Sequence, residues 1–363
     1  MGGNEQSYVK EAFDTNWIAP LGPNVDAFEK SIEKFLGNNI NVAVLSSGTA
    51  AIHLALELLG VTDGDDVICQ SFTFAASANP ITYLGAKPVF VDSERETWNM
   101  SPQLLEKAIT AGLEKGKKPK AIIAVHLYGM PYKVSEITEI AVKYNIPVIE
   151  DSAEALGSTY NNEACGRFGD FGILSFNGNK IITTSGGGAL VTKNIELKNK
   201  AVFLATQARD DAAHYQHSHI GYNYRMSNVL AGIGRGQMEV IDERVKARRS
   251  NYNYYNEKLG KLAKIEFLEE PKGFHSNRWL SCILLPTYEI REEIRMALLK
   301  ENIESRPLWK PMHMQPVFMG CAQFVDGTSE DLFNRGLCLP SGSNLIKEDL
   351  NRVIEVILKT LVV

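Results

Sequence analysis

The chain has 363 residues, of which 44% are hydrophobic and 22% are charged, so it is long enough for one large and one smaller domain. The formal net charge is -5 with no basic stripe, which argues against a nucleic-acid-binding protein. The five cysteines are scattered without C-x-x-C spacing, which argues against a disulfide framework and a zinc site. The N-terminus has no signal pattern, and no apolar run is long enough to span a bilayer, which argues against a membrane protein. We therefore expect a cytoplasmic protein.

The first half of the chain alternates short β-rich runs with helical patterns. This alternation predicts a mostly parallel sheet with helices on both faces. Helices are expected at residues 50–59 and at 102–112, where Ser101-Pro102 forms an N-terminal signal. The expected strands are residues 42–45, 66–69, 88–92, 121–127, 147–150, 172–176 and 189–192.

The second half is more helical and ends in a mixed pattern. A long charged stretch covers residues 237–259, and a short strand is expected at 279–285. Helices are expected at 291–301 and 347–361. We predict a large domain of residues 1–237 and a smaller α+β domain of residues 238–363.

Asp151 and Lys180 carry the chemistry that this sequence predicts. Asp151 ends one apolar run, and Lys180 follows another after a short turn. Ligands of parallel sheets bind beyond the carboxyl ends of the strands, so both side chains are expected at one site. A lysine for a Schiff base and an acid for the ring nitrogen are what pyridoxal 5'-phosphate (PLP) requires. The alternatives are a solvated acid at a strand end and an exposed loop lysine.

Three further features fit the same cofactor but have ordinary explanations as well. The turn Ser47-Gly48-Thr49 can present helix N–H groups to a phosphate, or it can simply cap a helix. Phe74 can stack on a flat ring or pack in the core. Glu154 can face a ring hydroxyl or lie on a surface helix.

Basic and aromatic residues of the second half suggest a substrate with phosphates. Arg278, Arg306 and Trp309 can grip phosphate and cover a sugar or base, or they can pack between domains. The cluster His214, His217 and His219 lacks an acid or cysteine at ligand spacing, so we do not expect a metal there.

Taken in order, these motifs resemble the DegT/StrS-type sugar aminotransferases, which are PLP enzymes of fold type I. The resemblance covers nearly the whole chain. It rests on residues 16–23, 47–51, 150–154, 175–188, 221–227 and 306–313. The segment 177–188 is most similar to the branch that makes UDP-4-amino-4,6-dideoxy-N-acetylglucosamine, a precursor of bacillosamine-type sugars.

The resemblance implies a role for each matching residue. Lys180 would form the Schiff base and shuttle protons, and Asp151 would pair with the ring nitrogen. The other cofactor contacts would come from Gly48, Thr49 and Ser175 at the phosphate, Phe74 at the ring face, Glu154 near the ring hydroxyl, and Asn223 at the phosphate of the neighbouring subunit of a homodimer. Substrate contacts are expected from Asn179, Arg225, Arg278, Arg306, Trp309 and His313.

The function implied is transfer of the amino group of L-glutamate to the 4-keto carbon of a nucleotide-linked 4-keto-6-deoxy sugar. UDP-2-acetamido-2,6-dideoxy-4-keto-hexose is the expected acceptor, and a dTDP-linked sugar is the alternative. A PLP-dependent sugar dehydratase typically has His in place of the lysine, so Lys180 argues against it. A silent PLP-binding regulator is the remaining alternative.

Overall fold

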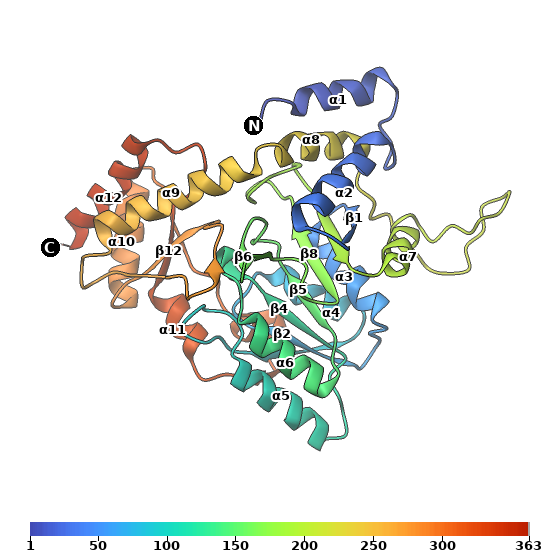
Figure 1. The fold of residues 1–363 in the computed structure, drawn as a ribbon. Coiled ribbons are helices and arrows are strands. Elements are labelled where there is room, and N and C mark those ends of the chain that lie inside the picture. The colour runs from blue at the N-terminus through green and yellow to red at the C-terminus, as the bar shows by residue number, and fades with distance from the viewer. Residues whose placement is uncertain (362–363) are drawn as a thin grey trace.

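A computed structural model describes residues 1–361 and shows a central eight-stranded sheet. The strand order is β1-β9-β8-β5-β4-β2-β3-β14, and Figure 1 shows this sheet at the centre of the molecule. Neighbours from β8 to β14 are parallel, whereas β9 is antiparallel to both β1 and β8. The strands are β1 (Asn41–Leu45), β2 (Asp66–Gln70), β3 (Lys87–Val91), β4 (Ala121–Val125), β5 (Val148–Asp151), β8 (Phe171–Ser175), β9 (Gly188–Thr192) and β14 (Ala322–Phe324).

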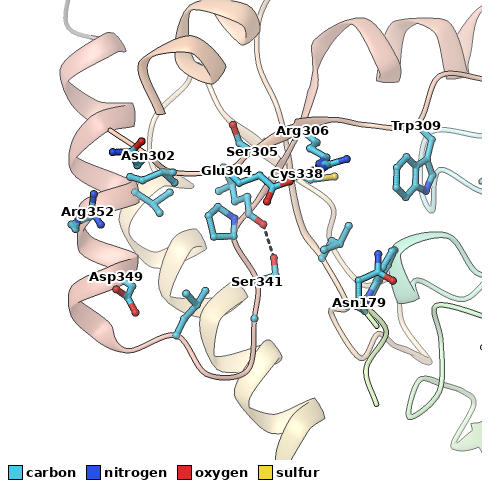
Figure 2. Close-up of a pocket in the computed structure, with 18 residues that line it drawn as sticks. Asn179, Asn302, Glu304, Ser305, Arg306, Trp309, Cys338, Ser341, Asp349 and Arg352 are labelled. Carbon is cyan, nitrogen blue, oxygen red and sulfur yellow. Dashed lines mark hydrogen bonds and ion pairs between the residues drawn. The ribbon is translucent and has the colours of Figure 1, made fainter. Parts of the chain in front are cut away.

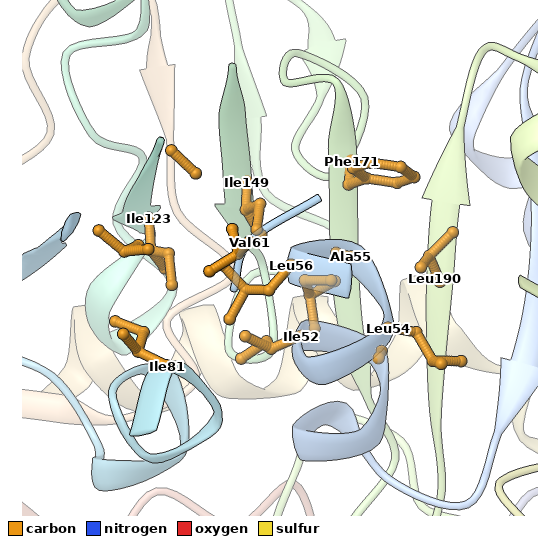
Figure 3. Packing of buried hydrophobic residues seen from close by; sticks show 14 of the residues in the cluster. Ile52, Leu54, Ala55, Leu56, Val61, Ile81, Ile123, Ile149, Phe171 and Leu190 are labelled. Atoms are coloured by element: carbon orange, nitrogen blue, oxygen red, sulfur yellow. The ribbon is translucent and has the colours of Figure 1, made fainter. Parts of the chain in front are cut away.

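Helices cover both faces of this sheet because successive strand residues point to opposite sides. On β4, Ile123 packs with α3, α4 and α7, whereas its neighbours Ile122 and Ala124 pack with α5 and α6. Figure 3 shows the first of these layers, with Ile52 and Leu56 of α3 facing Ile123 and Ile149. The helices of the first part are α1 (Glu5–Asp14), α2 (Pro23–Leu36), α3 (Gly48–Leu58), α4 (Asn79–Tyr83), α5 (Pro102–Glu114), α6 (Val134–Tyr144), α7 (Ile195–Ala205) and α8 (Asn228–Met238).

Local sequence signals explain where several of these helices begin. Ser47 accepts a hydrogen bond from the backbone N–H of Ala50 at the start of α3. Ser101 does the same for Leu104 at the start of α5, and Pro102 occupies the first helical position. The cap of α3 is the one that matters for function, because it fixes the N-terminus of that helix at the carboxyl edge of the sheet.

The C-terminal part has its own sheet and helices, yet it is tied to the large sheet. Two smaller sheets have the orders β10-β12-β15-β13 and β11-β6-β7. Strand β14 pairs with β3 of the large sheet, and β11 pairs with β6 from the first half. The elements are β6 (Thr159–Tyr160), β7 (Glu163–Ala164), α9 (Ile241–Leu259), β10 (Glu266–Phe267), β11 (Phe274–His275), β12 (Ser281–Leu284), α10 (Tyr288–Lys300), β13 (Arg306–Pro307), α11 (Thr328–Arg335), β15 (Gly336–Leu339) and α12 (Lys347–Leu361).

The fold class predicted from the sequence is confirmed: an α/β protein with a mostly parallel sheet and a smaller α+β part. Phe74 is followed by the 3-10 turn Ala75–Ser77 and then by the short helix α4. The charged stretch 237–259 begins at the end of α8 and continues as α9. The division at residue 237 stays a prediction, since strands on either side of it share sheets. Among residues 1–361, no helix has the length and apolar character that a membrane span requires.

Candidate active site

A cavity of about 350 Å³ lies at the carboxyl edge of the parallel strands, and both Asp151 and Lys180 line it. Asp151 is the last residue of β5, while Lys180 lies in the loop between β8 and β9. Other lining residues come from the turn before α3, from the segment after β2 and from the C-terminal part. The structure thus brings together side chains that are far apart in the chain, as expected for this edge of an α/β sheet.

Lys180 is held between a carboxylate and an aromatic ring. Its Nζ atom lies 3.4 Å from Oε1 of Glu154 and 4.2 Å from the centre of the Trp279 ring. The Trp279 ring is fixed because its indole N–H donates to the carbonyl oxygen of Asn179 at 2.8 Å. An indole face is the strongest aromatic partner for a cation, so both contacts hold the lysine side chain in place on the cavity wall.

Glu154 is a buried carboxyl group beside Lys180. Burial raises the pKa of its carboxyl group, although the Lys180 amine and the backbone N–H of Tyr128 act in the opposite direction. That N–H donates to Oε2 of Glu154 at 2.7 Å. A buried carboxyl group with a raised pKa can exchange a proton with a lysine beside it, which suits acid–base chemistry.

The start of α3 and the end of β8 form one part of the cavity lining. The first N–H groups of a helix have no partner within the helix, so Gly48 and Thr49 can offer theirs to an anion. Ser175 lies beside them, and a Cβ atom on Gly48 would come within 3.3 Å of its Cβ atom. A Cβ atom on Gly188 would lie 2.3 Å from the backbone nitrogen of Gly48. Glycine at both positions therefore allows the close approach that forms this cradle.

Asp151 and this cradle together fit PLP. The lining of this one cavity includes an anion site, a carboxylate and a lysine. Phe74 lines the same cavity with 54% of its surface exposed, and its ring lies 5.6 Å from that of Trp309. An exposed ring beside such a cavity is available to stack on a flat cofactor.

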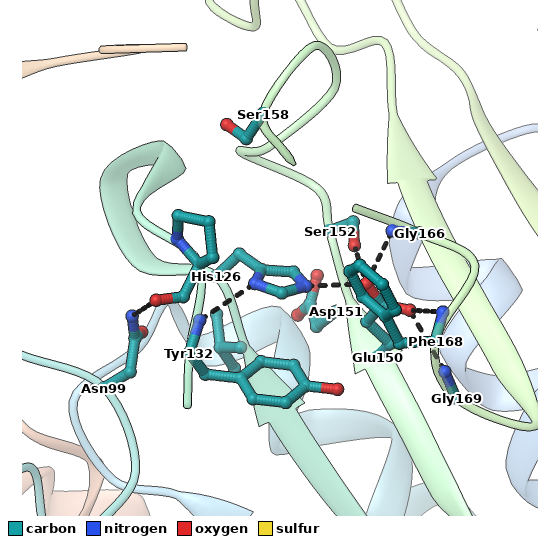
Figure 4. A network of polar contacts seen from close by, with 12 residues as sticks. Asn99, His126, Tyr132, Glu150, Asp151, Ser152, Ser158, Gly166, Phe168 and Gly169 are labelled. Atoms are coloured by element: carbon teal, nitrogen blue, oxygen red, sulfur yellow. Dashed lines mark hydrogen bonds and ion pairs between the residues drawn. The ribbon is translucent and has the colours of Figure 1, made fainter. Parts of the chain in front are cut away.

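Behind Asp151, a buried network fixes the end of β5 (Figure 4). Nε2 of His126 lies 2.6 Å from Oε1 of Glu150, while its Nδ1 accepts the backbone N–H of Tyr132. His126 must therefore carry its proton on Nε2 and donate it to Glu150. The ligand atoms of His126, Glu150 and Cys165 lie within 4.8 Å of one another. Hydrogen bonds already engage both imidazole nitrogens, so this cluster is better suited to fixing the strand than to binding a metal.

A second cavity of about 630 Å³ adjoins the first, and Asn179, Trp279 and Trp309 line both. Figure 2 shows Asn179 and Trp309 on one side of it and Asp349 and Arg352 of α12 on the other. Arg306 also lines this second cavity, where Glu304 pairs with it.

Four of the predicted residues line neither cavity. Arg225 pairs with Glu29 and donates to the Val44 carbonyl, and Asn223 pairs with Thr206 in an isolated bridge.

The other two are held by contacts with other parts of the chain. Arg278 donates to the Leu268 carbonyl and covers the Tyr252 ring. His313 lies 2.6 Å from the Ser71 hydroxyl and 3.2 Å from Glu330.

The histidines at 214, 217 and 219 are exposed on the long loop after α7, which projects away from the sheet in Figure 1.

Trp279 and Ser77 line the first cavity but are not among the site residues predicted from the sequence. Trp279 directly follows Arg278 in the chain, and the basic residue attracted the prediction although the aromatic one lines the site. Ser77 was missed because nothing in the run Ala75-Ala76-Ser77 marks it out. Its hydroxyl donates to Oδ2 of Asp151 at 2.6 Å, a contact that only the folded chain reveals.

Comparisons with known proteins agree with this geometry. The DegT/DnrJ/EryC1/StrS aminotransferase family matches residues 1–358. The putative pyridoxal phosphate-dependent aminotransferase EpsN of Bacillus subtilis is 53% identical over 362 residues, covering 99% of this chain and 93% of EpsN. GDP-perosamine synthase of Escherichia coli O157:H7 is 40% identical over 354 residues, covering 97% of this chain and 94% of that protein.

Solved structures show the same fold. A DegT DnrJ EryC1 StrS aminotransferase from Brucella abortus has a TM-score of 0.92 at 30% identity, covering 98% of this chain and 95% of that one. The PLP form of the putative sugar aminotransferase Spr1654 from Streptococcus pneumoniae has a TM-score of 0.89 at 26% identity, covering 98% and 96%.

Fold and site together define a PLP-dependent aminotransferase of fold type I. The chain belongs to the DegT/DnrJ/EryC1/StrS aminotransferase family, whose members are transaminases that act on nucleotide-linked sugars.

Proposed function

We propose that this enzyme transfers the amino group of L-glutamate to the 4-keto carbon of UDP-2-acetamido-2,6-dideoxy-4-keto-hexose. The observation that carries the proposal is the cavity in which Lys180, Glu154 and Asp151 meet beside an anion cradle. The choice of acceptor rests on the resemblance of residues 177–188 to enzymes of the bacillosamine branch. Bound PLP would supply an electron sink for the carbon that loses and gains protons.

In this proposal the residues of the chain bind, orient and move protons. Lys180 would take up and release, at its Nζ atom, the proton that the reaction moves. Glu154 lies 3.4 Å from its amine and can take up or return that proton. Asp151 would accept a hydrogen bond from the ring nitrogen of bound PLP, and the N–H groups at the start of α3 would hold its phosphate.

The second cavity supports a nucleotide-linked acceptor rather than a small keto acid. It shares a wall with the cofactor cavity through Asn179, Trp279 and Trp309, so one long substrate can occupy both. Arg306 on its rim provides a planar cation that suits a diphosphate. We place the keto sugar near Lys180 and the nucleotide in the second cavity.

A second acceptor is favoured by one specific observation. The 40% identity to a GDP-perosamine synthase extends over 97% of this chain. A GDP-linked keto sugar is therefore the first alternative to the UDP sugar, ahead of a dTDP-linked one. Lys180 argues against a dehydratase, and its buried contact with Glu154 argues against a silent PLP-binding regulator.

We also propose a homodimer in which Asn223 of one subunit reaches the cofactor phosphate of its neighbour. The loop between α7 and α8 projects from the body of the subunit (Figure 1), and Tyr215 and Ile220 on it are 79% and 85% exposed. Ile18 and Leu21, before α2, are also exposed. Apolar side chains in such positions are suited to burial against a second copy.

Mixing two inactive variants tests the shared site. Lys180→Ala and Asn223→Ala would each remove one component, and a mixed dimer would contain one intact site. Subunit exchange at equal amounts should therefore restore about a quarter of wild-type turnover. No recovery after confirmed exchange would refute the contribution of Asn223 across the interface.

The function is tested by mass spectrometry with PLP, L-glutamate and three acceptors offered side by side: the UDP-, GDP- and dTDP-linked 4-keto-6-deoxy sugars. Amination of the UDP sugar at the highest kcat/KM supports the proposal. Preference for the GDP or dTDP sugar would overturn the acceptor and leave the aminotransferase chemistry intact. Lys180→Ala is the matched control, because it should form no product from any acceptor.

A further inference from the structure

Asp151 is supported by two hydroxyl groups in series. Oδ2 of Asp151 accepts the hydroxyl of Ser77 at 2.6 Å, and Oγ of Ser77 lies 2.8 Å from Oγ1 of Thr73. The other carboxylate oxygen, Oδ1, accepts the backbone N–H of Ala153 at 3.1 Å. Thr73 and Ser77 are each only 1% exposed. Both oxygens of the carboxylate are therefore fixed from within the protein.

The direction of these hydrogen bonds follows from the donors available. A carboxylate can only accept, so the proton between Ser77 and Asp151 belongs to the serine. With that proton committed, the Ser77 oxygen can only accept from Thr73. The chain of donation thus runs from Thr73 to Ser77 to Asp151, and each group is held in one orientation by the next.

The same short segment also carries the ring-facing aromatic. Phe74 precedes the 3-10 turn Ala75–Ser77, and both Phe74 and Ser77 line the cofactor cavity. The turn is fixed at its start, because the backbone N–H of Ser77 donates to the carbonyl of Phe74. One rigid turn therefore sets the face on which a ring would lie and the carboxylate at its edge.

We propose that Ser77 and Thr73 are positioning residues, which hold the Asp151 carboxylate as an acceptor for the ring nitrogen of the cofactor. The inference rests on the proposed role of Asp151. Without the serine hydroxyl, Oδ2 would lose its hydrogen-bond partner among residues 1–361, and the carboxylate could turn about its Cβ–Cγ bond. Without the threonine hydroxyl, the serine could rotate away.

The proposal predicts an effect that depends on one atom of the ligand. Pyridoxamine 5'-phosphate forms no Schiff base with Lys180, so its affinity reports non-covalent contacts alone. Ser77→Ala should weaken its binding about 10-fold, the scale of one hydrogen bond to a charged group. An analogue with C–H in place of the ring nitrogen makes no bond to Asp151. Its affinity should change less than about 2-fold.

Thr73 offers a matched pair of variants, because one keeps the hydroxyl and the other keeps the shape. Thr73→Ser should retain wild-type affinity, whereas Thr73→Val should weaken pyridoxamine phosphate about 3-fold, as an indirect hydrogen bond would. Thr82→Val is the control in the next helix, since its hydroxyl donates only to the Asn79 carbonyl among the contacts seen. Thr82→Val should bind both ligands with wild-type affinity.

Calorimetric titration of the full-length chain with both ligands decides the question. The expected result is a loss confined to the ligand with the ring nitrogen. Equal losses for both ligands in Ser77→Ala and Thr73→Val would show a merely structural role and overturn the proposal. Unchanged affinity for both would overturn it as well. The titration uses no sugar substrate, so its result is independent of the amino-transfer assay. The positioning role of Ser77 and Thr73 can be refuted while the proposed amino transfer stands, and the amino transfer can be refuted while the positioning role stands.

Discussion

The Glu150 network permits a sharp prediction about stability. Its carboxylate is fully buried and accepts hydrogen bonds from His126 and from the backbone N–H groups of Gly166, Phe168 and Gly169. His126 and Gly166 bond Oε1, whereas Phe168 and Gly169 bond Oε2. Glu150→Gln keeps the shape but replaces one oxygen by an NH₂ group, which would then face two N–H donors whichever way the amide turns.

The expected cost follows from this geometry. Two buried N–H groups without acceptors destabilise the fold by about 4 kcal/mol. For a chain of this length that corresponds to a melting temperature lower by roughly 5 °C. Calorimetry at pH 7 measures this change in melting temperature. Glu163→Gln is the matched control, because Glu163 is exposed and, within the described part of the chain, its carboxylate pairs with Arg167 alone, at 3.8 Å. A control of this kind should shift the midpoint by less than about 1 °C.

The pH dependence of stability provides a second test of the Glu150→Gln variant. Burial acts to raise the pKa of Glu150, but the donors led by His126 outweigh it and hold the pKa below its ordinary value. The stabilisation is thus present above about pH 4.3, the unfolded pKa, and is lost as the pH falls through the folded pKa. Glu150→Gln lacks this ionisation, so the difference in melting temperature between the variant and wild type should become smaller at acidic pH. A midpoint within about 1 °C of wild type at pH 7 would refute the reasoning.

Three further predictions concern single side chains. Lys180→Ala should bind pyridoxamine phosphate yet lose turnover by more than about 1000-fold, measured by product formation, because no other base would move the proton. Burial raises the pKa of Glu154, so its ionisation lowers stability as the pH rises through that pKa. Glu154→Gln should therefore have a higher melting temperature than wild type at pH 8 and nearly the same one at pH 4, measured by calorimetry. The Asp92 carboxylate accepts backbone N–H groups just before and at the start of α11, and Asp92→Asn would place an NH₂ group against some of them. We expect the free energy of unfolding to fall by about 3 kcal/mol and hydrogen exchange in α11 to become faster. Unchanged exchange in α11 would contradict this prediction.

Much of the fold could be predicted because its strands are short, apolar and separated by helical patterns. The pairing of β14 with β3 could not, since three residues more than 200 positions away carry no signal of their partner. The reversed direction of β9 was equally hidden, because a buried strand shows the same apolar run in either direction.

The site could be predicted where chemistry alone marks a residue. Asp151 and Lys180 follow strands, and their types suit a cofactor that few other pairs can hold. Ser77 and Trp279 could not be found in this way, because a hydroxyl or an indole has many ordinary uses. The sequence suggested Arg278 instead of its neighbour, yet the folded chain turns that arginine towards Leu268.

The position of β14 has a consequence for how the chain is made. Until residues 322–324 emerge from the ribosome, β3 has no neighbour on one side and remains an open edge with the apolar sequence Pro88-Val89-Phe90-Val91. Open apolar edges are templates for pairing between chains. The nascent enzyme must therefore carry this edge through the synthesis of more than 200 residues. Chaperone dependence and aggregation of C-terminally shortened chains should consequently originate at β3.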